Sequence, residues 1–128
     1  MYNRTDETDA VTTVAEDYFK AMINADEAEL RRMFHPQAPV TGLFGDEFSY
    51  GSLDSFIGFV KNTPAANENG NPLEYYVKGL VLVGDTAVVT VGNYCYSTRF
   101  TDHLSMIKIN GDWRIVAKAY CTHPPAES

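Results

Sequence analysis

The chain has 128 residues, a length typical of one domain, and its 45% apolar residues suffice for a single core. Its formal net charge of −7 argues against a nucleic-acid partner and against an anionic membrane surface, because both need a surplus of lysine and arginine. No apolar run is long enough to span a bilayer, and residues 1–9 show no basic segment followed by an apolar one. We therefore expect a cytoplasmic protein with one domain over residues 1–128.

Two cysteines, Cys95 and Cys121, are too few for a disulfide framework or for a zinc site. The sequence also lacks a glycine-rich phosphate-binding loop, a cluster of metal-ligating residues and a Gly-x-Ser-x-Gly elbow. We therefore expect free thiols, no bound metal and no cofactor.

Three segments in the first half of the chain have the pattern of helices. Over residues 10–24, apolar side chains recur at helical spacing and polar ones lie on the opposite side. A short second helix is expected to follow its N-cap, Asp26, and to stop before Pro36. A third helix is expected after Ser52, and its apolar residues again form one stripe.

The remaining segments have the pattern of strands. Residues 38–51 predict two short strands around a Gly-Asp turn, and residues from 73 onward predict four long strands rich in β-branched and aromatic residues. Gly84-Asp85 and Asn110-Gly111 predict tight turns, and Ser97-Thr98 is a weaker turn signal. Four strands joined by such turns form an antiparallel meander.

This order of elements predicts an α+β fold, in which a curved antiparallel sheet carries three helices on its concave face. The space between a curved sheet and its helices is where a small-ligand pocket usually forms. We therefore expect a mostly apolar cavity that takes a small apolar or aromatic molecule.

Two stretches of the sequence resemble a known family. The segment NADEAELRRMFHPQAPVTG resembles the opening of the NTF2-like superfamily, and DHLSMIKINGDWRIVAKAY resembles its final hairpin. Within that superfamily the chain is most similar to the small lumazine-binding-like or SnoaL-like proteins, over about residues 11–120. The resemblance implies a cystatin-like cone and a homodimer, which we expect to form through the convex face of the sheet. Because members include isomerases, dehydratases, cyclases, ligand-binding modules and transport factors, the resemblance does not decide the function.

The ketosteroid isomerases of this superfamily can be compared with the chain position by position. Their catalytic tyrosine corresponds to Tyr18. Their general base falls at about Gly42, where no carboxylate stands, and their second acid falls near Ser105. Two of the three groups are missing or replaced, so the resemblance does not carry that activity to this chain. The His-Asp pattern of the dehydratases is not matched at identifiable positions either.

Asp102 and His103 are adjacent in a predicted strand, where neighbouring side chains point to opposite faces. They therefore do not form a catalytic dyad unless a bulge intervenes. We expect His103 and Ser105 to face inward, since they share parity with two isoleucines that look like the inward partners of Trp113. Asp102 then falls on the convex face.

An inward histidine at this position has two interpretations. Histidine ionises near neutral pH, which suits a general acid or base, or a hydrogen-bond donor to a ligand. The alternative is a core residue bonded to a backbone carbonyl or a hydroxyl, which is the more common role of a histidine without an identified partner.

Other residues are candidates for the cavity wall. Tyr18 lies on the buried stripe of the first helix, where its hydroxyl meets either a ligand or a water molecule. His35 ends the second helix, where it bonds the last carbonyls or reaches a ligand at the cavity mouth. Asn93 and Cys95 are expected to face inward, although a buried thiol is a poor nucleophile. The predicted ligand-binding set is Tyr18, Met22, His35, Asn93, Cys95, His103 and Ser105, with His103 and Tyr18 as catalytic candidates.

Three functions stay open on the sequence alone, and it does not decide whether the protein is an enzyme. The first is a small-molecule-binding protein of unassigned ligand. The second is a cofactor-free isomerase, dehydratase or cyclase that uses His103 as acid or base and Tyr18 as hydrogen-bond donor. The third is a dimeric interaction module whose cavity is filled by its own side chains.

Overall fold

The computed structural model describes residues 4–124; residues 1–3, which begin the acidic N-terminal stretch, and residues 125–128 lie outside the described part. The helices are α1 (Arg4–Ile23), α2 (Glu27–Met33) and α3 (Leu53–Asn62). The strands are β1 (Pro39–Phe44), β2 (Glu47–Ser52), β3 (Glu74–Val83), β4 (Thr86–Cys95), β5 (Thr98–Ile109) and β6 (Asp112–His123).

The three predicted helices are confirmed, and local capping explains where two of them begin. The Asp26 side chain accepts a hydrogen bond from the Glu29 backbone N–H at 3.2 Å, which caps α2. Ser52 and Ser55 form a capping box at the start of α3. α1 begins earlier than expected, at Arg4, with acidic residues in its first turn, where the helix dipole favours negative charge.

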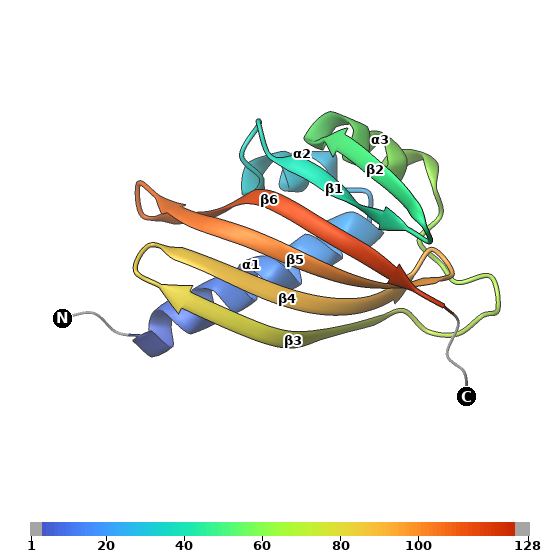
Figure 1. Cartoon of the computed structure of the whole chain (residues 1–128). Helices are drawn as coiled ribbons and strands as arrows, with labels where there is room; N and C mark the ends of the chain where they lie inside the picture. Colours follow the sequence, from blue (N-terminus) through green and yellow to red (C-terminus); the bar gives the residue numbers. More distant parts are fainter. Residues whose placement is uncertain (1–3, 125–128) are drawn as a thin grey trace.

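The six strands form one curved sheet in the order β2-β1-β6-β5-β4-β3 (Figure 1). The predicted antiparallel meander from β3 to β6 is confirmed. The sheet as a whole is mixed rather than antiparallel, because β1 pairs with β6 in parallel. The cause lies just after α2, where Phe34 bridges Ile115 in parallel and the His35 backbone N–H donates to the Ile115 carbonyl at 2.8 Å. The chain therefore already runs alongside β6, in its direction, before β1 begins.

α1 lies across the inner face of the sheet, and α2 and α3 cover the end formed by β1 and β2 (Figure 1). Val11, Ala15 and Tyr18 form the fully buried stripe of α1. Trp113 on β6 is 8% exposed, and its Nε1 donates to the Glu7 carboxylate at 2.7 Å. The α+β architecture, with three helices over one curved sheet, agrees with the prediction.

The outer face of the sheet carries exposed apolar side chains from β3, β4 and β5. They include Val81, Val83, Val88 and Ile107. A homodimer through this face stays a prediction. Within residues 4–124, no helix combines the length and the hydropathy that crossing a membrane requires.

Candidate active site

A cavity of about 460 Å³ lies between the inner face of the sheet and α3. Small organic molecules are commonly bound in cavities of roughly 300–1,000 Å³. Its wall contains seven aromatic rings, from Phe44, Phe48, Phe56, Phe59, Tyr96, Phe100 and Tyr120. The polar groups of the wall are Glu47, Ser49, Ser52, Ser55, Asn93, Asp102 and Lys118.

Asp102 on β5 is the most deeply buried of these polar residues, at 1% exposure. Its Oδ2 accepts hydrogen bonds from the Tyr18 hydroxyl at 2.7 Å and from Asn93 Nδ2 at 3.0 Å. Its Oδ1 is buried and has no hydrogen-bond partner among residues 4–124. Since buried polar atoms are almost always hydrogen-bonded, an unsatisfied acceptor in a residue of the cavity wall requires an explanation.

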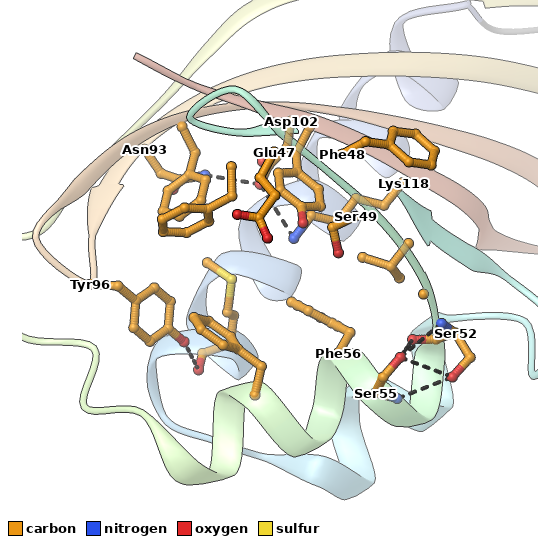
Figure 2. Close-up of a pocket in the computed structure, with 17 residues that line it drawn as sticks. Glu47, Phe48, Ser49, Ser52, Ser55, Phe56, Asn93, Tyr96, Asp102 and Lys118 are labelled. Atoms are coloured by element: carbon orange, nitrogen blue, oxygen red, sulfur yellow. Dashed lines mark hydrogen bonds and ion pairs between the residues drawn. The ribbon is translucent and has the colours of Figure 1, made fainter. Parts of the chain in front are cut away.

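Lys118 on β6 points toward Asp102 from the next strand (Figure 2). Its Nζ lies 3.9 Å from Asp102 Oδ2, which is an ion pair but too long for a hydrogen bond. The ammonium also lies 4.1 Å from the ring centre of Phe56 on α3, and 5.2 Å and 5.4 Å from those of Tyr18 and Tyr120. Burial lowers the pKa of Lys118, although the negative charge of Asp102 acts in the opposite direction.

A β-bulge aims Lys118 into the cavity. Met106 on β5 pairs with Ile115, but Ser105 pairs with Ala117, so Val116 is an extra residue on β6. Ile115 is buried, and simple alternation from it would place Lys118 on the outer face. Because the bulge reverses the alternation, Lys118 is buried instead, at 7% exposure.

Burial and the neighbouring carboxylate keep the hydroxyl of Tyr18 protonated. Burial raises its pKa well above the ordinary value, and the negative charge of Asp102 raises it further. Tyr18 is therefore a fixed donor to Asp102. Its ring also stacks on Phe56 at 6.4 Å between ring centres, which ties α1 to α3 across the cavity wall.

Cys95 lies beside Asn93 and orients its amide group. Burial raises the pKa of its thiol to about 12, so it stays protonated, and its Sγ donates to Asn93 Oδ1 at 3.3 Å. Accepting this bond turns the Nδ2 of Asn93 toward Asp102. The thiol thus orients an amide and is not placed to act as a nucleophile.

Tyr96 lines the cavity and has an uncommon backbone conformation. The turn between β4 and β5 is Tyr96-Ser97, one residue before the predicted position, and both residues have positive φ (55° and 58°). The Tyr96 hydroxyl donates to the Met22 carbonyl at 3.3 Å, and its ring meets Phe59 edge-on at 5.0 Å. Strained backbone of this kind is often found at functional sites.

The structure contradicts the predicted orientation of His103. His103 is exposed on the outer face, where its Nδ1 lies 2.8 Å from Thr90 Oγ1, and Asp102 is the buried neighbour. The predicted parity is wrong because of the hairpin register. Across the two-residue turn, Trp113 pairs with Lys108. The residues of β5 that face inward with Trp113 are therefore the even-numbered ones. We therefore place His103 outside the candidate site.

The other predicted residues divide into two groups. Met22 and Asn93 line the cavity, while Tyr18 and Cys95 lie behind its wall and are hydrogen-bonded to Asp102 and Asn93, respectively. Ser105 pairs with Val88 on the outer face, so its predicted inward orientation is wrong for the same reason as that of His103.

His35 does not reach the cavity. It lies in the turn after α2, where its Nδ1 accepts the Gln37 backbone N–H at 3.1 Å. Its predicted place at the cavity mouth is therefore wrong, and the side chain closes a turn instead.

Asp102 and Lys118 were not predicted from the sequence as site residues. The sequence contains the information that places Asp102 inside, because a two-residue turn at Asn110-Gly111 fixes which β5 residues lie on the same face as Trp113. Lys118 had no comparable signal, because its orientation depends on a bulge.

Gly42 lies on β1 where a neighbouring strand leaves no room for a side chain. A Cβ at this position would lie 2.2 Å from the Tyr120 carbonyl oxygen, so the parallel pairing of β1 with β6 admits no side chain there. A carboxylate cannot occupy this position. Asp102, an acid on β5, lies beside Tyr18. Within residues 4–124, no group of three histidine, cysteine or acidic residues could hold a metal ion.

The profile of the family described as "Putative lumazine-binding" matches residues 6–121. The chain belongs to this family. Its structure places it in the NTF2-like superfamily: an NTF2-like protein of unknown function from Silicibacter pomeroyi superposes with a TM-score of 0.86 at 28% identity, over 95% of this chain and 100% of that one. A ketosteroid isomerase-like protein from Erwinia carotovora atroseptica shares the fold, with a TM-score of 0.70 at 16% identity, over 97% and 100% of the two chains.

One relative of the chain is named after an enzymatic activity. The chain is 30% identical over 120 residues to the aldolase FrzH from a Cladobotryum species. The alignment covers 92% of this chain and 93% of the relative, so the similarity extends over nearly the whole length of both proteins.

Proposed function

We propose that this chain is an enzyme that acts on a small, mostly apolar carbonyl compound and moves a proton at the carbon next to the carbonyl group. This step is common to isomerases, dehydratases and aldolases. The observation that carries the proposal is the unpartnered Oδ1 of Asp102, buried at the wall of an apolar cavity beside Lys118. The name of the relative FrzH supports it, because an aldol reaction begins with the removal of such a proton.

The three polar groups have distinct roles in this reaction. Oδ1 of Asp102 is the free acceptor for the proton, so Asp102 is the general base. Tyr18 holds the carboxylate in place through Oδ2. The positive charge of Lys118 stabilises the negative oxygen that develops when the proton leaves, and it acts strongly because the wall around it is apolar.

The cost of burying charged side chains also favours a functional role for Asp102 and Lys118. An isolated buried charge is costly, and a buried ion pair is often no more stabilising than apolar residues of similar volume. The fold places Lys118 beside Asp102 through a bulge and leaves one carboxylate oxygen unsatisfied. Such arrangements are more common at active sites than in purely structural cores.

The test is exchange of the α-protons of carbonyl compounds for deuterium in D₂O, followed by ¹H NMR. The panel contains cyclic ketones and aliphatic aldehydes small enough for the cavity. The proposal predicts catalysed exchange of at least one of them by the wild-type chain, and its loss in Asp102→Asn. His103→Ala is the matched control, since it alters the adjacent residue on the opposite face of the same strand. Exchange that is equal in Asp102→Asn and wild type would overturn the proposal.

A second candidate function is binding without catalysis. The observation that favours it is the aromatic wall, whose rings can stack on a flat aromatic ligand. The description of the family as lumazine-binding points to the same class of ligand. Titration with lumazine, followed by fluorescence, tests this function. Saturable binding that is weakened by Phe56→Ala, together with no exchange on any carbonyl compound, would favour the binding protein over the enzyme.

A further inference from the structure

Lys118 differs from the other lysines described by its surroundings. Lys61 and Lys20 are largely exposed on helices, and each pairs with a glutamate. Lys108 donates to Glu7 at 2.7 Å. Lys118 is 7% exposed and faces the cavity, and among residues 4–124 its contacts are three aromatic rings and one long ion pair.

We propose that Lys118 is a catalytic nucleophile that forms an imine with the carbonyl carbon of an aldehyde or a small ketone bound in the cavity. The inference deepens the proposed function, on which its substrate class rests. It adds a covalent step at a residue to which the proposed function gives only an electrostatic role.

Three features of the site fit this step. A lysine acts as a nucleophile in its neutral form, and apolar surroundings favour that form. Burial lowers the pKa of Lys118 in this way. The 3.9 Å separation from Asp102 leaves the Nζ free of a hydrogen bond to that carboxylate, so its lone pair can point to a substrate once the proton has left. An iminium is a cation at the place of the ammonium, so the ring of Phe56 stabilises both.

The step balances with the groups present. The Lys118 ammonium gives a proton to Asp102, and the neutral nitrogen then forms a C–N bond to the carbonyl carbon while the C=O π pair moves to the oxygen. That oxygen takes the proton held by Asp102. The nitrogen loses a second proton, which Asp102 also transfers to the oxygen, and the C–O bond breaks to release water. The nitrogen keeps its third proton as the iminium.

The iminium links this step to the proton transfer proposed above. A carbon next to an iminium loses a proton more readily than one next to a neutral carbonyl, because the positive nitrogen receives the electron pair. The carboxylate of Asp102, again unprotonated, is the group beside it that takes this proton.

The test is reductive trapping on the full chain. The protein is incubated at pH 7 with propanal or cyclohexanone and sodium cyanoborohydride, which reduces an iminium to a stable secondary amine. Intact mass and peptide mapping then report the adduct, whose mass equals that of the carbonyl compound less one oxygen atom. We expect several-fold more label on Lys118 than on Lys20 or Lys61.

The controls keep the result interpretable. Lys61→Met is the matched variant and should keep the adduct on Lys118, while Lys118→Met should lose it. The site is mapped on the wild-type chain, so the result does not depend on whether Lys118→Met folds. Label spread over the exposed lysines, with none or no excess on Lys118, would overturn the inference.

The trapping result is distinguishable from the exchange result. Exchange that requires Asp102 but yields no adduct on Lys118 would leave the proposed function standing and overturn the covalent step. An adduct on Lys118 without exchange on any carbonyl compound would support the nucleophile and overturn the proposed proton transfer.

Discussion

The Tyr18 hydroxyl on α1 donates a 2.7 Å hydrogen bond to Asp102 Oδ2 on β5, between residues 84 positions apart in the sequence. This bond joins the helix to the centre of the sheet and fixes one oxygen of the carboxylate. The other oxygen, Oδ1, is buried and has no hydrogen-bond partner among residues 4–124. The bond thus connects the stability of the fold with the geometry of the candidate active site.

The substitution Tyr18→Phe removes this hydrogen bond with little change in volume. Hydrogen bonds to charged groups contribute about 1.5–3 kcal/mol, so we expect a loss of that order in the free energy of unfolding, measured with urea. Tyr50→Phe is the control, because Tyr50 is 79% exposed and its hydroxyl should contribute little. Equal stability of Tyr18→Phe and wild type would contradict the buried contact.

The pairing of Asp102 with Lys118 is expected to appear in a double-mutant cycle. Asp102→Asn leaves the buried charge of Lys118 without its partner, which should destabilise the fold by about 3–5 kcal/mol. Adding Lys118→Met removes that charge, so the double variant should be more stable than Asp102→Asn alone. Unfolding by urea gives the three differences, and strictly additive effects would show that the two side chains do not interact.

The two cysteines should differ in their reaction with iodoacetamide. The thiolate is the reactive form, and burial raises the pKa of Cys95 to about 12, so this residue should stay unmodified at pH 8 in the folded protein. Cys121 is partly exposed and should react. Any modification of Cys95 should become faster as the pH rises toward 12, because the thiolate fraction rises. Peptide mapping measures both sites, and rapid labelling of Cys95 at pH 8 would contradict its burial.

Trp113→Ala should be strongly destabilising. The indole is 8% exposed and donates to Glu7, so its removal leaves a cavity and takes one of two hydrogen-bond donors from the Glu7 carboxylate. Truncation of a buried large aromatic residue typically costs about 3–5 kcal/mol, which a thermal or urea unfolding curve resolves readily. Tyr50→Ala serves as the exposed aromatic control. Near wild-type stability of Trp113→Ala would mean that the indole is not part of the core.

Local signals in the sequence predicted most of the fold. The caps at Asp26 and Ser52 and the turn at Asn110-Gly111 lie where the sequence predicts them. Each of these features depends on residues close together in the chain, so a pattern of residue types suffices to find it. The parallel pairing of β1 with β6 depends on where the chain leaves α2, and the local pattern does not contain that information.

The candidate site was harder to predict because it depends on register. An error of one residue in the hairpin after Ile109 reverses the two faces of β5 and exchanges Asp102 with His103. The sequence did predict Tyr18 and Asn93, since both lie among buried apolar residues of regular elements. Without the bulge, the alternation of side chains along β6 predicts that Lys118 points outward.

The most direct test of this account is the ratio of the deuterium-exchange rates of Asp102→Asn and His103→Ala on the same carbonyl compound. General acid–base catalysis contributes about 10²–10⁴-fold, so Asp102→Asn should be slower than His103→Ala by at least about 100-fold. His103→Ala should match the wild-type rate, because its side chain lies on the outer face. The opposite result, with exchange lost in His103→Ala and kept in Asp102→Asn, would place the active site on the other side of the sheet and contradict the account.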